Sequence, residues 1–291
     1  MSTTRRGFIR QSSLLTAGLF LHKEDWFKPS RAIGVQLYTL RDAMEKDPKD
    51  TLAKVARLGY TQVEMFNYGE GKWFGMTPAE LKVVLQDNGL SSPSGHTFPA
   101  GYFLRKGWEE SWKKTVADAK TLGQEFIVSP WLEEEYRGGA DKFRQAAEAL
   151  NAAGEIARQQ GLTLAYHNHD FEFAPLGDTT GYAVLLANTD PRLVGFELDI
   201  YWAEKAGFDP VALFKKYPGR FPLWHVKDMD NSPKKFFTEV GNGVIDFKGI
   251  FREAKLSGMR YFFVEQDECP GSPFDSIEKS IGYLKKHIVR K

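Results

Sequence analysis

The sequence has little cysteine and no excess of charge of either sign. Its 291 residues include one cysteine, Cys269, which excludes an intramolecular disulfide and a zinc site built from cysteine pairs. The formal net charge is +1, which gives no electrostatic footprint for nucleic acid or for an anionic membrane. We therefore expect no nucleic-acid partner, and any metal ion must be held by histidine and carboxylate side chains.

The sequence also lacks an apolar run long enough to cross a bilayer as a helix. The short run from 12 to 21, SSLLTAGLFL, follows the paired arginines Arg5 and Arg6, an order that resembles a twin-arginine export signal. We predict that residues 1–29 are this leader, that the protein is exported to the periplasm, and that the mature chain has no membrane span. Because no clean A-x-A pattern follows, an uncleaved N-terminal anchor is the alternative.

Residues 30–291 contain no linker rich in proline, glycine or serine, which favours a single domain. Short apolar segments of strand character alternate with segments of helical period. The predicted strands are 32–40, 61–66, 91–98, 124–130, 162–169, 193–200, 221–228 and 261–268. The predicted helices are 46–58, 77–87 with Thr77 as its N-cap, 109–122, 141–160, 182–187, 210–217, 247–256 and 273–286. Eight such units predict an α/β fold, a single (β/α)8 TIM barrel.

Four polar side chains lie near the carboxyl ends of the last four predicted strands: His167, Asp199, His225 and Glu265. In a parallel barrel these strand ends meet at one mouth, where ligands bind. Two imidazoles and two carboxylates suit Zn²⁺, Mn²⁺, Co²⁺ or Fe²⁺, so we predict one divalent metal ion at this site. Taken singly, each residue has a structural alternative, because strand-end Asp residues cap helices and strand His residues are often satisfied core groups. His169, on the same face as His167, is its main rival.

Further polar and aromatic residues are predicted at the same mouth. Strand alternation places Glu64, Glu197, Lys227 and Asp267 on inward positions. The candidate catalytic residues are Glu265, Lys227, Glu64 and Glu172, in acid/base or oxyanion-stabilising roles. The candidate substrate-binding residues are His96, His169, Trp202, Tyr38 and Trp131, where the aromatic rings offer a wall for a sugar ring. The alternatives are buried ion-pair partners for the charged residues and core filling for the aromatic ones.

The chain from about residue 32 to 288 resembles the xylose isomerase-like TIM barrels. This superfamily of sugar phosphate isomerases and epimerases also includes endonuclease IV, inosose dehydratase and ketose 3-epimerases. The segments that carry the resemblance are GVQLYTLRD (34–42), VEMF (63–66), SGHTF (94–98), YHNHDFEF (166–173), ELDIYW (197–202), WHVKD (224–228), GNGVIDF (241–247) and VEQD (264–267). They are specific for the superfamily and much less so for the reaction.

The resemblance also implies a ligand set, from which this sequence departs. In the epimerases, a Glu, an Asp, a His and a second Glu from successive strands bind one divalent ion. These fall on His167, Asp199, His225 and Glu265, so a histidine stands where the first Glu is usual. The change removes one negative charge and should favour a softer ion such as Zn²⁺ or Fe²⁺. The epimerases often carry a His three residues after the metal Asp, and here that residue is Trp202.

The resemblance implies a small carbohydrate substrate and leaves open whether the protein is a homo-oligomer. We expect a metal-dependent sugar isomerase or epimerase that removes a proton next to a carbonyl and stabilises the enediolate with the metal. The alternative is an exported lyase that performs β-elimination on 3-keto sugars or glycosides. A non-catalytic carbohydrate-binding barrel and an endonuclease IV-like phosphodiesterase are less favoured. The latter uses a trinuclear cluster, and the chain has only six histidines.

Overall fold

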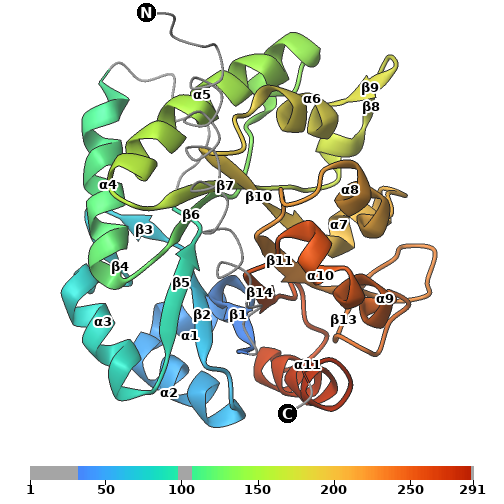
Figure 1. The fold of residues 1–291 in the computed structure, drawn as a ribbon. Helices are drawn as coiled ribbons and strands as arrows, with labels where there is room; N and C mark the ends of the chain where they lie inside the picture. Colours follow the sequence, from blue (N-terminus) through green and yellow to red (C-terminus); the bar gives the residue numbers. More distant parts are fainter. Residues whose placement is uncertain (1–31, 98–106, 290–291) are drawn as a thin grey trace, which may run out of the picture.

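The computed structural model describes residues 32–97 and 107–289, so the predicted leader lies outside the described residues. Eight parallel strands form a barrel with the helices around it (Figure 1). In chain order the barrel strands are β1 (Gly34–Gln36), β2 (Gln62–Met65), β5 (Ser91–Gly95), β6 (Phe126–Ser129), β7 (Thr163–His167), β10 (Val194–Asp199), β11 (Leu223–Val226) and β14 (Tyr261–Val264).

The strands follow one another around the barrel in their order along the chain. Seven neighbouring pairs form a continuous parallel sheet, from β5 through β2, β1, β14, β11, β10 and β7 to β6. The remaining gap between β5 and β6 is bridged just beyond the end of β5, where His96 pairs with Val128 and the Thr97 N–H donates to the Val128 carbonyl at 3.2 Å. The predicted TIM barrel is confirmed.

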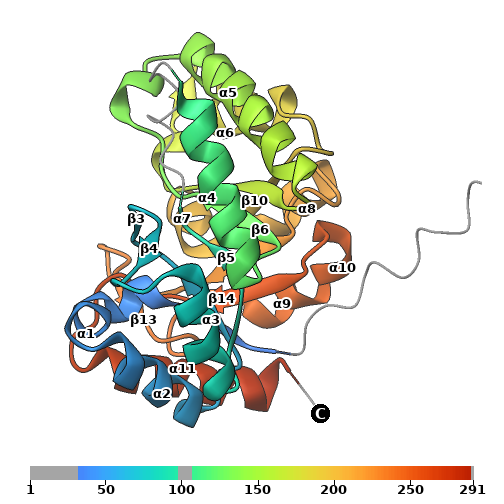
Figure 2. The same ribbon diagram turned by 90° about the vertical axis from the view of Figure 1, so that its left-hand side faces the viewer.

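The helices lie outside the strands, and α3 and α4 pack side by side on one flank (Figure 2). Thr77 caps α3 in a reciprocal capping box with Glu80, as its sequence position predicts. Within the described ranges, no helix is long and apolar enough to cross a membrane. The helices are α1 (Arg41–Lys46), α2 (Pro48–Leu58), α3 (Pro78–Asp87), α4 (Trp108–Leu122), α5 (Ala140–Gln159), α6 (Gly181–Asn188), α7 (Ile200–Lys205), α8 (Pro210–Lys216), α9 (Phe247–Arg252), α10 (Ala254–Ser257) and α11 (Pro273–His287).

The apolar core has two parts because successive strand residues face opposite sides. A large cluster fills the space between strands and helices. A small one, formed by Phe126, Val128, Ala165, Leu223 and Phe263, fills the barrel interior. Ala165 and Leu223 each lie two residues before a predicted metal ligand, and Phe263 two residues before Glu265. The interior is therefore apolar below and polar at the carboxyl ends of the strands.

Several local predictions were wrong. The predicted strand 32–40 ends at Gln36, whose side chain accepts the Tyr38 N–H at 3.1 Å and starts the 3-10 turn η1 (Leu37–Leu40). Three short hairpins and helix α7 were not predicted, because two-residue strands and a six-residue helix carry too little periodicity. The hairpins are β3 (Tyr68–Gly69) with β4 (Lys72–Trp73), β8 (Pro175–Leu176) with β9 (Thr179–Thr180), and β12 (Asp228–Met229) with β13 (Phe237–Thr238).

Candidate active site

The four predicted metal ligands converge at the carboxyl end of the barrel. His167 ends β7, Asp199 ends β10, His225 lies in β11 and Glu265 directly follows β14. One potential ligand atom from each lies within 4.8 Å of the others, and all four residues are buried. Asp199 and His225 are direct register partners, which sets two of the four side chains next to each other. We call this set the metal-candidate cluster.

The polar atoms of this cluster fit a metal ion. Both ring nitrogens of His167 are buried and make no hydrogen bond within the described residues. Its Nε2 lies 3.4 Å from Asp199 Oδ2. Buried polar atoms are rarely left without a hydrogen bond, because nothing then offsets the free energy lost with their hydration. Burial lowers the pKa of His167, which keeps the ring in the neutral form that binds metals.

Asp199 has a structural role as well. Its Oδ1 accepts the Trp202 N–H at 2.9 Å and so caps α7. Its backbone N–H donates to Asn168 Oδ1 at 3.0 Å, which ties the end of β10 to the loop after β7. The second oxygen, Oδ2, is left facing the cluster. The capping alternative and the ligand prediction therefore apply to different oxygens of one carboxylate.

Each of the two ring nitrogens of His225 contacts a carboxylate. Nδ1 lies 2.8 Å from Glu265 Oε2, and Nε2 lies 2.6 Å from Glu64 Oε2. Histidine ligands in proteins usually hold the metal with one nitrogen and donate the other N–H to a carboxylate, which fixes the ring orientation. Glu64 occupies that outer position, and Nδ1 is the nitrogen that faces the metal-candidate cluster.

A second set of titratable groups, Glu64, His96, Glu197 and His225, lies directly beside the first. Glu64 accepts hydrogen bonds from Gln36 Nε2 at 2.8 Å and from Ser94 Oγ at 2.5 Å, besides that of His225. His96 Nε2 lies 2.7 Å from Glu197 Oε2. Burial raises the pKa of Glu64, and the nearby Glu197 carboxylate raises it further. The sequence predicted these residues one by one but gave no sign of this network.

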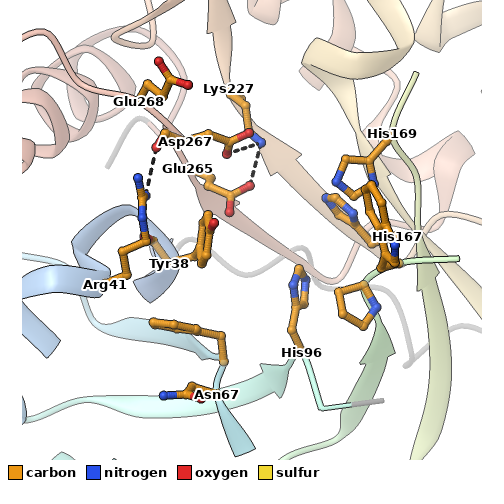
Figure 3. Close-up of a pocket in the computed structure, with 13 residues that line it drawn as sticks. Tyr38, Arg41, Asn67, His96, His167, His169, Lys227, Glu265, Asp267 and Glu268 are labelled. Carbon is orange, nitrogen blue, oxygen red and sulfur yellow. Dashed lines mark hydrogen bonds and ion pairs between the residues drawn. The ribbon is translucent and has the colours of Figure 1, made fainter. Parts of the chain in front are cut away.

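A cavity of about 510 Å³ opens above the metal-candidate cluster, within the ~300–1,000 Å³ range usual for small-molecule sites (Figure 3). Figure 3 shows Lys227, Glu265 and Asp267 on one side of it and His96, His167 and His169 on another. The lining residues are Tyr38, Arg41, Phe66, Asn67, His96, Pro130, Trp131, His167, His169, Lys227, Glu265, Asp267 and Glu268.

Two aromatic side chains stand at the cavity with large exposed surfaces. Tyr38 is 42% exposed and Trp131 is 41% exposed, unusual values for large apolar groups. Tyr38 packs edge-on against Phe66 with ring centres 5.5 Å apart, and Trp131 packs against His169 at 4.7 Å. Both therefore offer a supported ring face to a ligand, and their role in substrate binding stays a prediction.

Three of the predicted catalytic and substrate-binding residues do not line the cavity, and neither do the predicted metal ligands Asp199 and His225, which lie below it. Glu64 lies beneath it, in the hydrogen-bonded network around His225. Trp202 packs behind His169, with ring centres 5.6 Å apart, because Asp199 caps the helix that carries it and turns the chain away from the mouth. Glu172 is buried, and its carboxylate accepts the Tyr166 hydroxyl at 2.6 Å and the His169 N–H at 2.8 Å. These positions favour supporting roles over direct contact with a substrate.

Glu172→Gln is expected to remove a pH dependence of stability. Burial raises the pKa of Glu172 from 4.5 to about 8, so between these values the folded state holds a proton that the unfolded chain releases. The stability that Glu172 contributes is therefore fully present below about pH 4.5 and is lost as the pH rises through about 8. Because Gln stays neutral, the free energy of unfolding of the variant should rise relative to that of the wild type by on the order of a few kcal/mol as the pH increases over this range.

Thermal unfolding of both proteins from pH 5 to 9 measures this effect. Glu148→Gln, at an exposed position of α5, is the control and should follow the wild type. A difference in Tm between Glu172→Gln and the wild type that does not change with pH would contradict the assignment.

Comparison with known proteins places the chain in a family. Residues 52–287 match the family model described as xylose isomerase-like TIM barrel. A structure described as a sugar phosphate isomerase/epimerase from Parabacteroides distasonis is 30% identical, with a TM-score of 0.77 over 90% of this chain and 96% of that one. A structure of the IOLI protein with a binding zinc atom is 16% identical, with a TM-score of 0.66 over 89% of this chain and 96% of that one, which shows a shared fold.

Curated relatives are named inosose dehydratase. One from Lactiplantibacillus plantarum is 28% identical over 167 residues, which cover 51% of this chain and 55% of that protein. The match thus spans only about half the length of that relative. Another, from Salmonella agona, is 27% identical over 284 residues, which cover 84% of this chain and 88% of that protein. The family match and the Parabacteroides structure together show that this chain belongs to the xylose isomerase-like TIM barrel family.

Proposed function

We propose that the protein is a divalent-metal-dependent lyase that eliminates water from a polyhydroxylated ketone, either a keto sugar or a cyclic polyol ketone. The observation that carries the proposal is the uneven distribution of carboxylates around the cavity. Glu265, Asp267 and Glu268 all come from the loop after β14, while histidines line another side (Figure 3). A reaction that needs one base suits this arrangement better than an epimerisation with a carboxylate on each face of the substrate.

The metal-candidate cluster would hold the ion through a ring nitrogen of His167, Asp199 Oδ2, His225 Nδ1 and the Glu265 carboxylate. A divalent ion bound there would act as a Lewis acid that polarises the substrate ketone. The donor set suits Zn²⁺, Mn²⁺, Co²⁺ or Fe²⁺, and the zinc in the IOLI structure supports this choice of ions.

The side chains at the cavity can divide the proton transfers between them. We assign removal of the proton next to the ketone to Glu265, whose carboxylate borders the cavity. Lys227 lines the cavity with its Nζ 2.7 Å from Asp267 Oδ1, and it can place a positive charge beside the oxygen on which negative charge develops. His96 is oriented by Glu197 and lies on another side of the cavity, where it can protonate the departing hydroxyl. The C–H and C–O bonds break, a C=C bond forms and water leaves.

The dehydratase names of the relatives support an elimination. The substrate is a proposal, because the first of these matches spans only about half of the relative's length. The second candidate is the sugar isomerase or epimerase expected from the sequence. The name of the Parabacteroides structure, 30% identical over most of both chains, favours it. Both reactions start with loss of a proton next to a carbonyl and differ in the step that follows.

Incubation of zinc- or manganese-loaded protein in D₂O separates the candidates. The substrates are an inosose, a 3-keto glucoside, a free ketose and a sugar phosphate, and the products are followed by NMR. The lyase should produce an unsaturated ketone from one of the first two. Deuterium incorporation with a new epimer or isomer and no elimination would favour the second candidate. The absence of exchange with every compound would contradict both.

A further inference from the structure

Lys227 forms ion pairs with two members of the metal-candidate cluster, Asp199 and Glu265, without belonging to it. It is 1% exposed, and its Nζ lies 3.0 Å from Asp199 Oδ2 and 2.7 Å from Glu265 Oε2. Its third contact is Asp267 Oδ1, at 2.7 Å, which lies outside the cluster. A lysine this deeply buried keeps its charge only when carboxylates surround it, and here three do.

The contacts of Lys227 involve the same atoms that would hold the metal ion. Asp199 Oδ2 is the oxygen that the capping of α7 leaves free. Glu265 Oε2 is the oxygen shared with His225 Nδ1. An ammonium group and a divalent ion cannot occupy the same few ångströms between these carboxylates, since each would repel the other.

We propose that Lys227 is a resident counter-ion that occupies the metal-candidate cluster until a metal ion arrives, and then withdraws onto Asp267 at the cavity wall. The proposal rests on the metal centre of the proposed function and adds a residue that sets how tightly that centre binds its ion. In the metal-free protein, Lys227 offsets the repulsion between Asp199 and Glu265 and holds them close together. When the metal ion binds, Lys227 loses its contacts with Asp199 and Glu265 and keeps its contact with Asp267.

A purely structural ion pair would predict a different response to mutation. If Lys227 only stabilised the site, its loss would disorder the ligands and weaken metal binding. If it competes with the metal, its loss should strengthen metal binding and destabilise the metal-free protein. Asp267 should then act through Lys227, because it is the only one of the three carboxylates that can retain the lysine once the metal is bound.

A double-mutant cycle with Lys227→Met and Asp267→Asn tests the proposal. The zinc dissociation constant is measured by competition with a chromophoric chelator, which requires no substrate and no turnover. Lys227→Met should tighten zinc binding by about 10- to 100-fold. Asp267→Asn should weaken it severalfold in the wild-type background and markedly less in the Lys227→Met background, since its partner is then absent. Lys205→Met, which removes a nearby cation stacked on Trp202 at 4.5 Å, is the control and should change little.

Thermal unfolding of the metal-free proteins gives a second readout. Metal-free Lys227→Met should have a lower Tm than the metal-free wild type, and zinc should raise its Tm more. If Lys227→Met does not fold without metal, the comparison moves to Lys227→Arg, which keeps the charge and should keep the effect of Asp267→Asn. Weaker zinc binding in folded Lys227→Met, or an equal effect of Asp267→Asn in both backgrounds, would overturn the role of Lys227 alone. A wild-type protein that binds no divalent ion would overturn the metal centre and this role together.

Discussion

Asp199→Asn is expected to abolish tight metal binding. It should also reduce turnover by more than the ~10–100-fold loss that is typical when a residue that only orients a metal ligand is replaced. Asn removes the negative charge that Oδ2 presents to the metal-candidate cluster. It keeps an oxygen for the Trp202 N–H, and Asn is as good an N-cap as Asp. The change therefore separates the ligand role of Asp199 from its capping role, and the barrel should stay folded.

Metal content by elemental analysis, turnover, and circular dichroism of the same preparations check this prediction. Asp209→Asn is the matched control, because Asp209 caps α8 through the Val211 N–H at 2.8 Å and is not part of the metal-candidate cluster. It should keep full metal content and activity. Stoichiometric metal in folded Asp199→Asn would remove Asp199 from the ligand set.

Glu64→Gln is expected to weaken metal binding by about 10- to 100-fold, because the His225 ring loses the carboxylate that fixes its orientation. Glu64 accepts three hydrogen bonds from Gln36, Ser94 and His225. An amide at this place turns one acceptor into a donor that faces other donors. The defect should appear first as poor metal retention.

The dependence of the rate on metal concentration separates two roles for Glu64. A residue that positions His225 should recover much of its activity when zinc is saturating. A general base, as the sequence alone predicted, should stay inactive at any zinc concentration. Glu172→Gln is the control, since that carboxylate is also buried but contacts Tyr166 and His169 and not the metal-candidate cluster. Its metal affinity should equal that of the wild type.

The fold and the convergence of the four ligand candidates could be predicted from the sequence, because both depend on short-range periodicity. His225 follows Leu223 by two residues and Asp199 follows Glu197 by two, so alternation puts both members of each pair on the same face of their strand. In the structure these four residues all face the barrel interior. In a closed barrel of parallel strands, one end of every strand reaches the same mouth. Position along a strand thus implies proximity in space.

Periodicity gives the face of a strand and not the depth of a side chain. Glu64 and Lys227 were both predicted at inward positions, yet one lies beneath the cavity and the other at its wall. Glu172 and Trp202 follow strand ends, where alternation no longer applies. The 3-10 turn η4 (Phe171–Phe173) carries Glu172 back under β7, and the start of α7 sets Trp202 behind His169. The contacts of Lys227 join the segment after β11 to the end of β10 and to the loop after β14, and the periodicity of single strands does not predict such contacts.

The reaction was less predictable than the site. The sequence already showed one departure from the epimerases, a histidine at position 167 where their first metal-binding Glu is usual. The structure adds that the remaining carboxylates at the cavity come from one loop, and the dehydratase relatives point the same way. Together they move the proposed elimination ahead of the isomerisation that the sequence favoured. Export through the twin-arginine route stays a prediction, since residues 1–29 lie outside the described residues.

Anomalous diffraction from zinc-loaded crystals tests the metal centre most directly. The result expected is a single zinc ion bound by His167, Asp199 Oδ2, His225 Nδ1 and Glu265, with Lys227 moved onto Asp267. An ion held instead by Glu64, His96 and Glu197, or no bound ion in fully loaded protein, would contradict it.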